Sequence, residues 1–178
     1  YLILFLGFSL SSLIGGTFHG FFNNNPSSQF HSPFWQATLI CIGVSAYGFA
    51  LSGIHLIYGF DNNQKYKNLL NRLFLLYAAS TFFYKSFLMA ITFYLPSTIL
   101  TLIGFVKAFH RSNNKNIKLG VWGLCLSLIA PIIQQAQLSL HPVYFTYNAA
   151  YHTIIMVALY LFYIGVAGIL NTTSGEKT

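Results

Sequence analysis

Long apolar segments separated by short polar stretches run through almost the whole chain. We predict six of them as helices, over residues 1–22, 33–60, 67–84, 86–109, 117–138 and 146–170, followed by a flexible polar tail over 171–178. A helix needs roughly 20 residues to cross a bilayer. The segments lack the alternation over about ten residues that marks the strands of a membrane barrel. The pattern therefore predicts an all-α, multi-pass transmembrane bundle that forms one domain over residues 1–170.

A single charge sets the boundary between the third and fourth predicted helices. One helix over residues 69–95 would place Lys85 near the middle of the membrane, where a lysine is costly. A turn at residues 84–86 removes this cost. With this turn, Pro96 lies inside the fourth predicted helix, and Pro131 lies inside the fifth. We expect a kink at each proline.

Composition agrees with a membrane protein. Charged residues make up 6% of the 178 positions and hydrophobic residues 55%, whereas soluble domains carry about 25% charged residues. The net charge is +7, but the basic residues flank the apolar segments, so we predict contact with lipid headgroups and no nucleic acid. Tyr1 already lies in an apolar run, and we expect a further helix upstream of it.

Basic residues gather around alternate connections between the predicted helices. The two other long loops, residues 23–32 and 139–145, have none. By the positive-inside rule, the basic loops and the C-terminus are cytoplasmic, and only Lys85 falls on the outer side. The cytoplasmic group is Lys65, Lys67, Arg72, Lys107, Arg111, Lys115, Lys118 and Lys177.

Two histidines are predicted at a similar depth near the outer surface. His19 lies about one turn from the outer end of the first helix, and His152 about two turns into the last. Polar residues at membrane depth tend to face the bundle interior or a wet cavity. Asn148 shares a helix face with His152, because it precedes it by four residues. Gln134 and Gln135, at the outer end of the fifth helix, are predicted to bind a ligand or to bond across helices.

Two short motifs resemble a known superfamily. They are Gly-Gly-Thr-Phe-His-Gly over residues 15–20 and Asn-Ala-Ala-Tyr-His over residues 148–152. The chain resembles the seven-helix membrane proteins that include alkaline ceramidases and the progestin and adiponectin receptors, and it is similar to uncharacterised bacterial members. The ceramidases and receptors carry Ser-x-x-x-His, an Asp and His-x-x-x-His, and their histidines hold zinc, whereas the bacterial members share the Gly-Gly-x-x-His-Gly and Asn-x-x-x-His pattern. The resemblance implies a lost first helix, zinc on His19 and His152, and a metal-dependent lipid hydrolase acting on an amphiphile.

The chain departs from that pattern at important positions. Gly15 replaces the motif serine and Asn148 replaces a histidine, while the two acids, Asp61 and Glu176, are predicted on the cytoplasmic side. Catalytic zinc usually has three protein ligands, and hydrolysis needs a base. His141 in the outer loop is the remaining candidate for that base. The alternative is a non-catalytic binding, receptor-like or structural membrane protein with a degenerate metal site.

Two further expectations concern packing and transport. Gly16 and Gly20 have the spacing that lets helices approach closely, so we predict that they pack against a neighbour. A transporter or channel is the third functional class. Only Pro96 and Pro131 favour it, because the two halves of the chain show no repeat.

Overall fold

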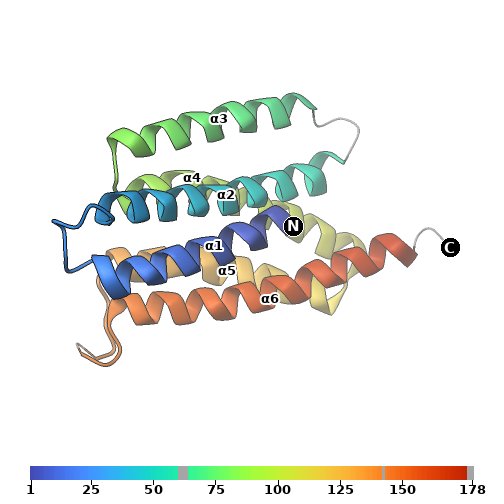
Figure 1. Ribbon diagram of the computed structural model, residues 1–178. Coiled ribbons are helices and arrows are strands. Elements are labelled where there is room, and N and C mark those ends of the chain that lie inside the picture. Colours follow the sequence, from blue (N-terminus) through green and yellow to red (C-terminus); the bar gives the residue numbers. More distant parts are fainter. Residues whose placement is uncertain (60–63, 142, 176–178) are drawn as a thin grey trace. The chain divides into compact units, whose positions relative to one another are not determined.

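The computed structural model describes residues 1–59, 64–141 and 143–175. Within them the chain forms six α-helices and no strand, which confirms the predicted all-α class (Figure 1). The helices match the six predicted segments. They are α1 (Leu2–Thr17, continued by the π-helical turn η1, Phe18–Phe22), α2 (His31–Tyr58), α3 (Gln64–Phe83), α4 (Phe87–Ser112), α5 (Lys115–Gln135) and α6 (Tyr147–Gly175).

Five of the described helices are long and apolar enough to cross a membrane. They are Leu2–Phe22, His31–Tyr58, Phe87–Ser112, Lys115–Gln135 and Tyr147–Thr172. The chain is therefore an integral, multi-pass membrane protein. The helix α3 is not among the five, so its crossing of the membrane stays a prediction. Its first turns carry Lys65, Lys67 and Arg72 among other polar residues, and these lower its mean hydropathy.

The helix boundaries follow the predicted ones with one clear exception. Residues 84–86 are not helical, so the break placed there to keep Lys85 out of the membrane is confirmed. Pro96 and Pro131 lie inside α4 and α5, and the kinks stay predictions. The exception is α6, which runs to Gly175. The first part of the predicted tail, residues 171–175, is therefore helical. Asp61, Glu176 and Lys177 lie outside the described residues.

The chain divides into two compact units, Tyr1–Ser97 and Thr98–Thr178. The first unit holds α1, η1, α2, α3 and the start of α4. The second holds the rest of α4, α5 and α6. The division falls directly after Pro96 within α4. The prediction of a single membrane domain stays a prediction.

In the first unit, α1 packs closely against α2 through small residues. A Cβ atom added to Gly48 would lie 2.7 Å from the Leu4 Cα, and one added to Gly7 would lie 2.6 Å from the Ser45 Oγ. Only glycine permits this approach of two helix backbones. The predicted packing of Gly16 and Gly20 is wrong for the described residues, since a Cβ on either glycine would meet none of their atoms within 4 Å. Both glycines are exposed. They lie on the face of α1 and η1 that points away from α2.

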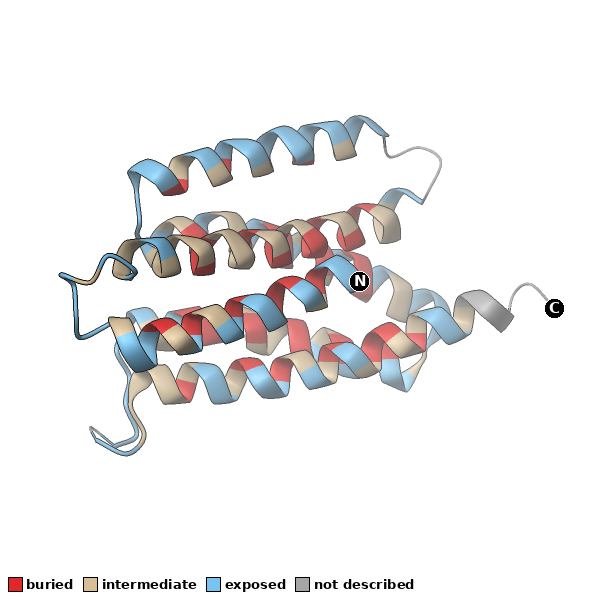
Figure 2. Cartoon of the chain, viewed as in Figure 1, coloured by how far each residue is buried: buried red, intermediate tan, exposed pale blue. Residues whose placement is uncertain are grey.

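The helix α3 runs antiparallel to α2 along most of its length (Figure 1). At one end the Tyr58 and Tyr66 rings stack with centroids 4.2 Å apart. At the other end the Trp35 Nε1–H donates to the Lys85 carbonyl over 2.7 Å. The outer face of α3 is exposed and largely apolar over its second half (Figure 2), as expected for a surface in contact with lipid.

In the second unit, α5 and α6 pack antiparallel through facing glycines. A Cβ on Gly120 would lie 2.8 Å from the Gly165 Cα. The fully buried Phe105 ring of α4 lies beside this contact and packs 5.1 Å from the Phe162 ring, centroid to centroid. The interface is therefore closed by backbone atoms and one aromatic pair.

Candidate functional site

His19 lies in the π-helical turn η1 at the loop end of the first unit. Such turns are rare, and they occur frequently at functional sites. The His19 side chain is exposed, and its ring centroid lies 5.3 Å from that of Phe18 and 6.1 Å from that of Trp35. The described surroundings of His19 are thus aromatic.

The same end of the first unit holds a hydrogen-bonded lysine that the sequence prediction treated only as a boundary marker. The Lys85 Nζ donates to the Ser32 Oγ over 2.5 Å. The Trp35 indole fixes the backbone of the turn by its bond to the Lys85 carbonyl. One signal in the sequence could have identified this lysine as a candidate functional residue. It is a single basic residue at a predicted turn, on the predicted outer side, where no other basic residue falls.

The second unit joins two of the predicted site residues. The Gln134 Nε2 donates to the Asn148 Oδ1 over 3.3 Å and so links the end of α5 to the start of α6. The interhelical role predicted for Gln134 is confirmed. The neighbouring Gln135 is exposed at the last position of α5.

One polar atom of this pair has no hydrogen-bond partner. The Gln134 Oε1 is buried and receives no hydrogen bond from the described part of the chain. A buried acceptor left unpaired costs about 1–3 kcal/mol. A donor from another molecule would remove that cost.

His152 lies one turn after Asn148 on α6. Its side chain is exposed, and its ring centroid lies 4.9 Å from that of Tyr151. Gln134, Asn148 and His152 therefore follow one another at the loop end of the second unit. We call these three residues the amide–histidine site.

His141, the candidate for the missing base, is engaged within its own loop. Its Nδ1 accepts the backbone N–H groups of Val143 and Tyr144 over 3.2 and 3.1 Å. Its backbone pairs with that of Phe145 in an isolated bridge. These bonds give His141 a role in shaping the loop before α6.

The predicted site is divided between the two units. His19 belongs to the first unit, while Gln134, Gln135, Asn148 and His152 belong to the second. The joint site with His19 and His152 at one depth stays a prediction.

The described donor atoms do not fit a catalytic zinc ion. Within the described ranges, no three His, Cys, Asp or Glu side chains gather in a way that could hold a metal. Both acids of the sequence fall outside those ranges, and the Asn148 amide oxygen already accepts from Gln134. Catalytic zinc normally needs three protein ligands. Zinc binding by His19 and His152 stays a prediction.

The chain belongs to a family of unknown function, DUF6962, whose model matches residues 1–171. No curated protein and no solved structure matches the chain. The chemistry of the site is therefore the basis for assigning a function.

Proposed function

We propose that this membrane protein binds an amphiphile whose headgroup donates a hydrogen bond, and that the amide–histidine site receives it. The observation that carries the proposal is the buried Gln134 Oε1, which has no donor in the described chain. A headgroup would reach this oxygen when the half-buried Gln134 side chain turns outward. Gln134 lies at the end of α5, where lipid headgroups can supply a donor.

The three side chains complement a headgroup that both donates and accepts. The Gln134 Oε1 accepts only, the Asn148 Nδ2 donates, and the His152 imidazole does either according to its tautomer. Hydroxyl and amide groups have this mixed character. Carboxylates accept without donating, so they fit the Gln134 oxygen poorly.

The surroundings of the site favour an amphiphile over a water-soluble ligand. Ile132 precedes Gln134 by two positions and its side chain is 62% exposed, while Met156 follows His152 by one turn and is 66% exposed. Exposed apolar side chains on membrane helices face lipid tails. A bound headgroup would therefore sit beside a surface suited to its hydrocarbon chain.

We further propose that the amide–histidine site faces outward and that the C-terminus is cytoplasmic. The helix α3 follows α2 from the Tyr58–Tyr66 stack to the Trp35–Lys85 bond, so it covers the same depth as a helix that can span the membrane. Its 20 residues rise about 30 Å, enough for the hydrocarbon core. If α3 did not cross, the basic residues before and after α4 would lie on opposite sides, against the positive-inside rule.

Ligand chemistry gives the direct test of binding. The probes are a long-chain N-acylethanolamine, which carries an N–H and an O–H donor, and its N,O-dimethyl analogue, which carries neither. We expect the purified full chain to bind the first at least about tenfold more tightly, because the analogue leaves the buried acceptor unpaired. Equal affinities by equilibrium dialysis in detergent would contradict the proposal.

A metal-dependent lipid hydrolase is the second candidate. Its support is the pair of sequence motifs that contain His19 and His152. It would need a further ligand and a base beyond the described donor set, and Asp61 is one of the residues outside that set. Zinc is measured in the purified wild type and in the His19→Ala and His152→Ala variants. Hydrolysis of ceramide-type lipids that disappears in His152→Ala would favour this candidate, and absence of zinc from every sample would end it.

A further inference from the structure

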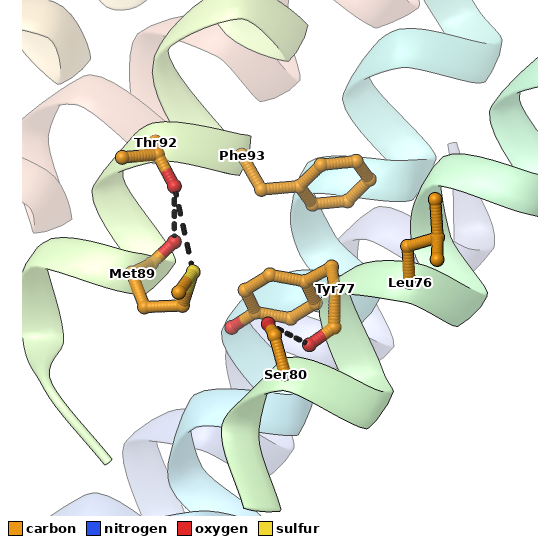
Figure 3. A pocket seen from close by; sticks show the side chains of 6 residues that line it. All are labelled: Leu76, Tyr77, Ser80, Met89, Thr92 and Phe93. Carbon is orange, nitrogen blue, oxygen red and sulfur yellow. Dashed lines mark hydrogen bonds between the residues drawn. The ribbon is translucent and has the colours of Figure 1, made fainter. Parts of the chain in front are cut away.

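A groove lies between α3 and α4 within the first unit (Figure 3). Its volume is about 270 Å³, just below the range of roughly 300–1,000 Å³ for sites that enclose a whole small molecule. It is thus sized for part of a ligand. The lining residues are Leu76, Tyr77, Ser80, Met89, Thr92 and Phe93.

Two stacked rings shape this groove. The Tyr77 and Phe93 rings lie with centroids 5.0 Å apart and planes inclined by 16°. Gly43 of α2 makes room for the Tyr77 ring, since a Cβ there would overlap its Cε1 atom. Tyr77 is held in place at its other end, where its hydroxyl donates to the Leu39 carbonyl.

The groove offers mainly apolar surface, although three hydroxyl groups line it. The Tyr77 proton goes to the Leu39 carbonyl, the Ser80 Oγ donates to the Tyr77 carbonyl over 2.6 Å, and the Thr92 Oγ1 donates to the Met89 carbonyl over 2.7 Å. All three protons are used within the protein. Leu76 at the groove is 68% exposed. A hydrocarbon chain fits these walls better than a polar ligand does.

A cation lies in the turn that joins the two helices lining the groove. Lys85 follows Ser80 by five residues and precedes Met89 by four. Its ammonium has three donors, of which the Ser32 Oγ receives one. No acidic residue falls within the described parts of the chain, so no described carboxylate neutralises Lys85.

We infer that the groove and Lys85 together bind one anionic phospholipid. Its phosphate lies on the Lys85 Nζ and one acyl chain lies along the Tyr77–Phe93 floor. A helix from a second copy is the poorer occupant, because a helix with its side chains is about 10–12 Å wide and the groove is small. This site is separate from the amide–histidine site, which belongs to the second unit and presents a hydrogen-bond acceptor.

Native mass spectrometry of the full chain, offered equal amounts of phosphatidylmethanol, an anionic lipid whose headgroup has no hydrogen-bond donor, and phosphatidylcholine, tests this inference. We expect retention of one lipid, with phosphatidylmethanol preferred about fivefold, the effect of one lysine near an anionic headgroup. Lys85→Gln should abolish the preference while lipid is still retained. Thr92→Trp should fill the groove and reduce retention of both lipids at least fivefold.

Two matched controls accompany these variants. Lys65→Gln removes a basic residue at the opposite end of α3, and Thr153→Trp replaces an exposed threonine whose hydroxyl donates to the Ala149 carbonyl on α6. Both should retain phosphatidylmethanol as the wild type does. A preserved preference in Lys85→Gln, or a lipid-free dimer that Thr92→Trp dissociates, would overturn the inference. If Thr92→Trp does not elute as a single peak, the Lys85→Gln result decides alone.

Discussion

The α5–α6 pair of the second unit and the α2–α3 pair of the first unit use glycine in opposite ways. In the second unit Gly120 faces Gly165, so the backbones of α5 and α6 touch and the interface closes. In the first unit Gly43 faces the Tyr77 ring, which keeps α3 away from α2 by the thickness of a side chain. A glycine opposite a glycine therefore gives a tight helix pair, whereas a glycine opposite an aromatic ring positions that ring as the floor of a groove.

The polar groups of the two units differ in whether all of them have a hydrogen-bond partner. The hydroxyls of the α3–α4 groove all donate to backbone carbonyls of the protein. The amide pair of the second unit leaves a buried oxygen without a donor. This difference is why we propose a hydrocarbon chain beside a cation for the first unit and a headgroup with a hydrogen-bond donor for the second.

The largest expected effect comes from breaking the glycine contact of the second unit. Gly120→Leu places a side chain where the Gly165 backbone lies, and we expect a loss of about 3 kcal/mol or more in the free energy of unfolding. Gly16→Leu is the matched control, because nothing lies within 4 Å of a Cβ there. Unfolding in mixed micelles, followed by circular dichroism, measures both. Similar losses in the two variants would show that the α5–α6 contact is looser than described.

A smaller effect should follow at the aromatic contact of the first unit. Gly43→Ala directs a methyl group into the Tyr77 ring, and we expect about 1–3 kcal/mol of destabilisation. Combining it with Tyr77→Leu should cost less than the sum of the two single changes, because the clash is then already relieved. Strict additivity in the same unfolding assay would contradict the packing of Tyr77 against Gly43.

The smallest effect is expected at the amide pair. Asn148→Leu leaves Gln134 without its acceptor, and we expect a loss of about 1 kcal/mol, near the upper part of the range for hydrogen bonds between membrane helices. The double variant with Gln134→Leu should be closer to the wild type, because no unpaired amide then remains. A double variant less stable than Asn148→Leu alone would show that Gln134 stabilises the protein through other contacts.

Much of the fold could be predicted from the sequence because hydrophobic length and charge placement are local properties. The apolar runs located all six helices, and the cost of burying Lys85 located the turn at residues 84–86. The packing glycines could not be predicted, since they depend on how α1 is rotated against α2. Gly16 and Gly20 have the four-residue spacing of packing glycines, but they lie on the face of the segment that does not contact α2.

The candidate site was predictable only in part. The depth of Gln134 indicated an interhelical hydrogen bond, but nothing in the sequence paired it with Asn148 or left its Oε1 without a donor. The groove was equally hidden, because Tyr77 and Phe93 meet only through the packing of α3 on α4. Contacts of this kind arise from the register of neighbouring helices, which hydropathy does not encode.

Two adjacent glutamines provide the most direct test of the proposed binding function. Gln134 bonds to Asn148 and keeps a buried acceptor, whereas Gln135 is exposed. The affinity of the full chain for long-chain N-acylethanolamine is measured in detergent for Gln134→Leu and Gln135→Leu. Our account predicts a loss of about tenfold or more for Gln134→Leu and an unchanged affinity for Gln135→Leu. Equal affinities in the two variants would contradict it.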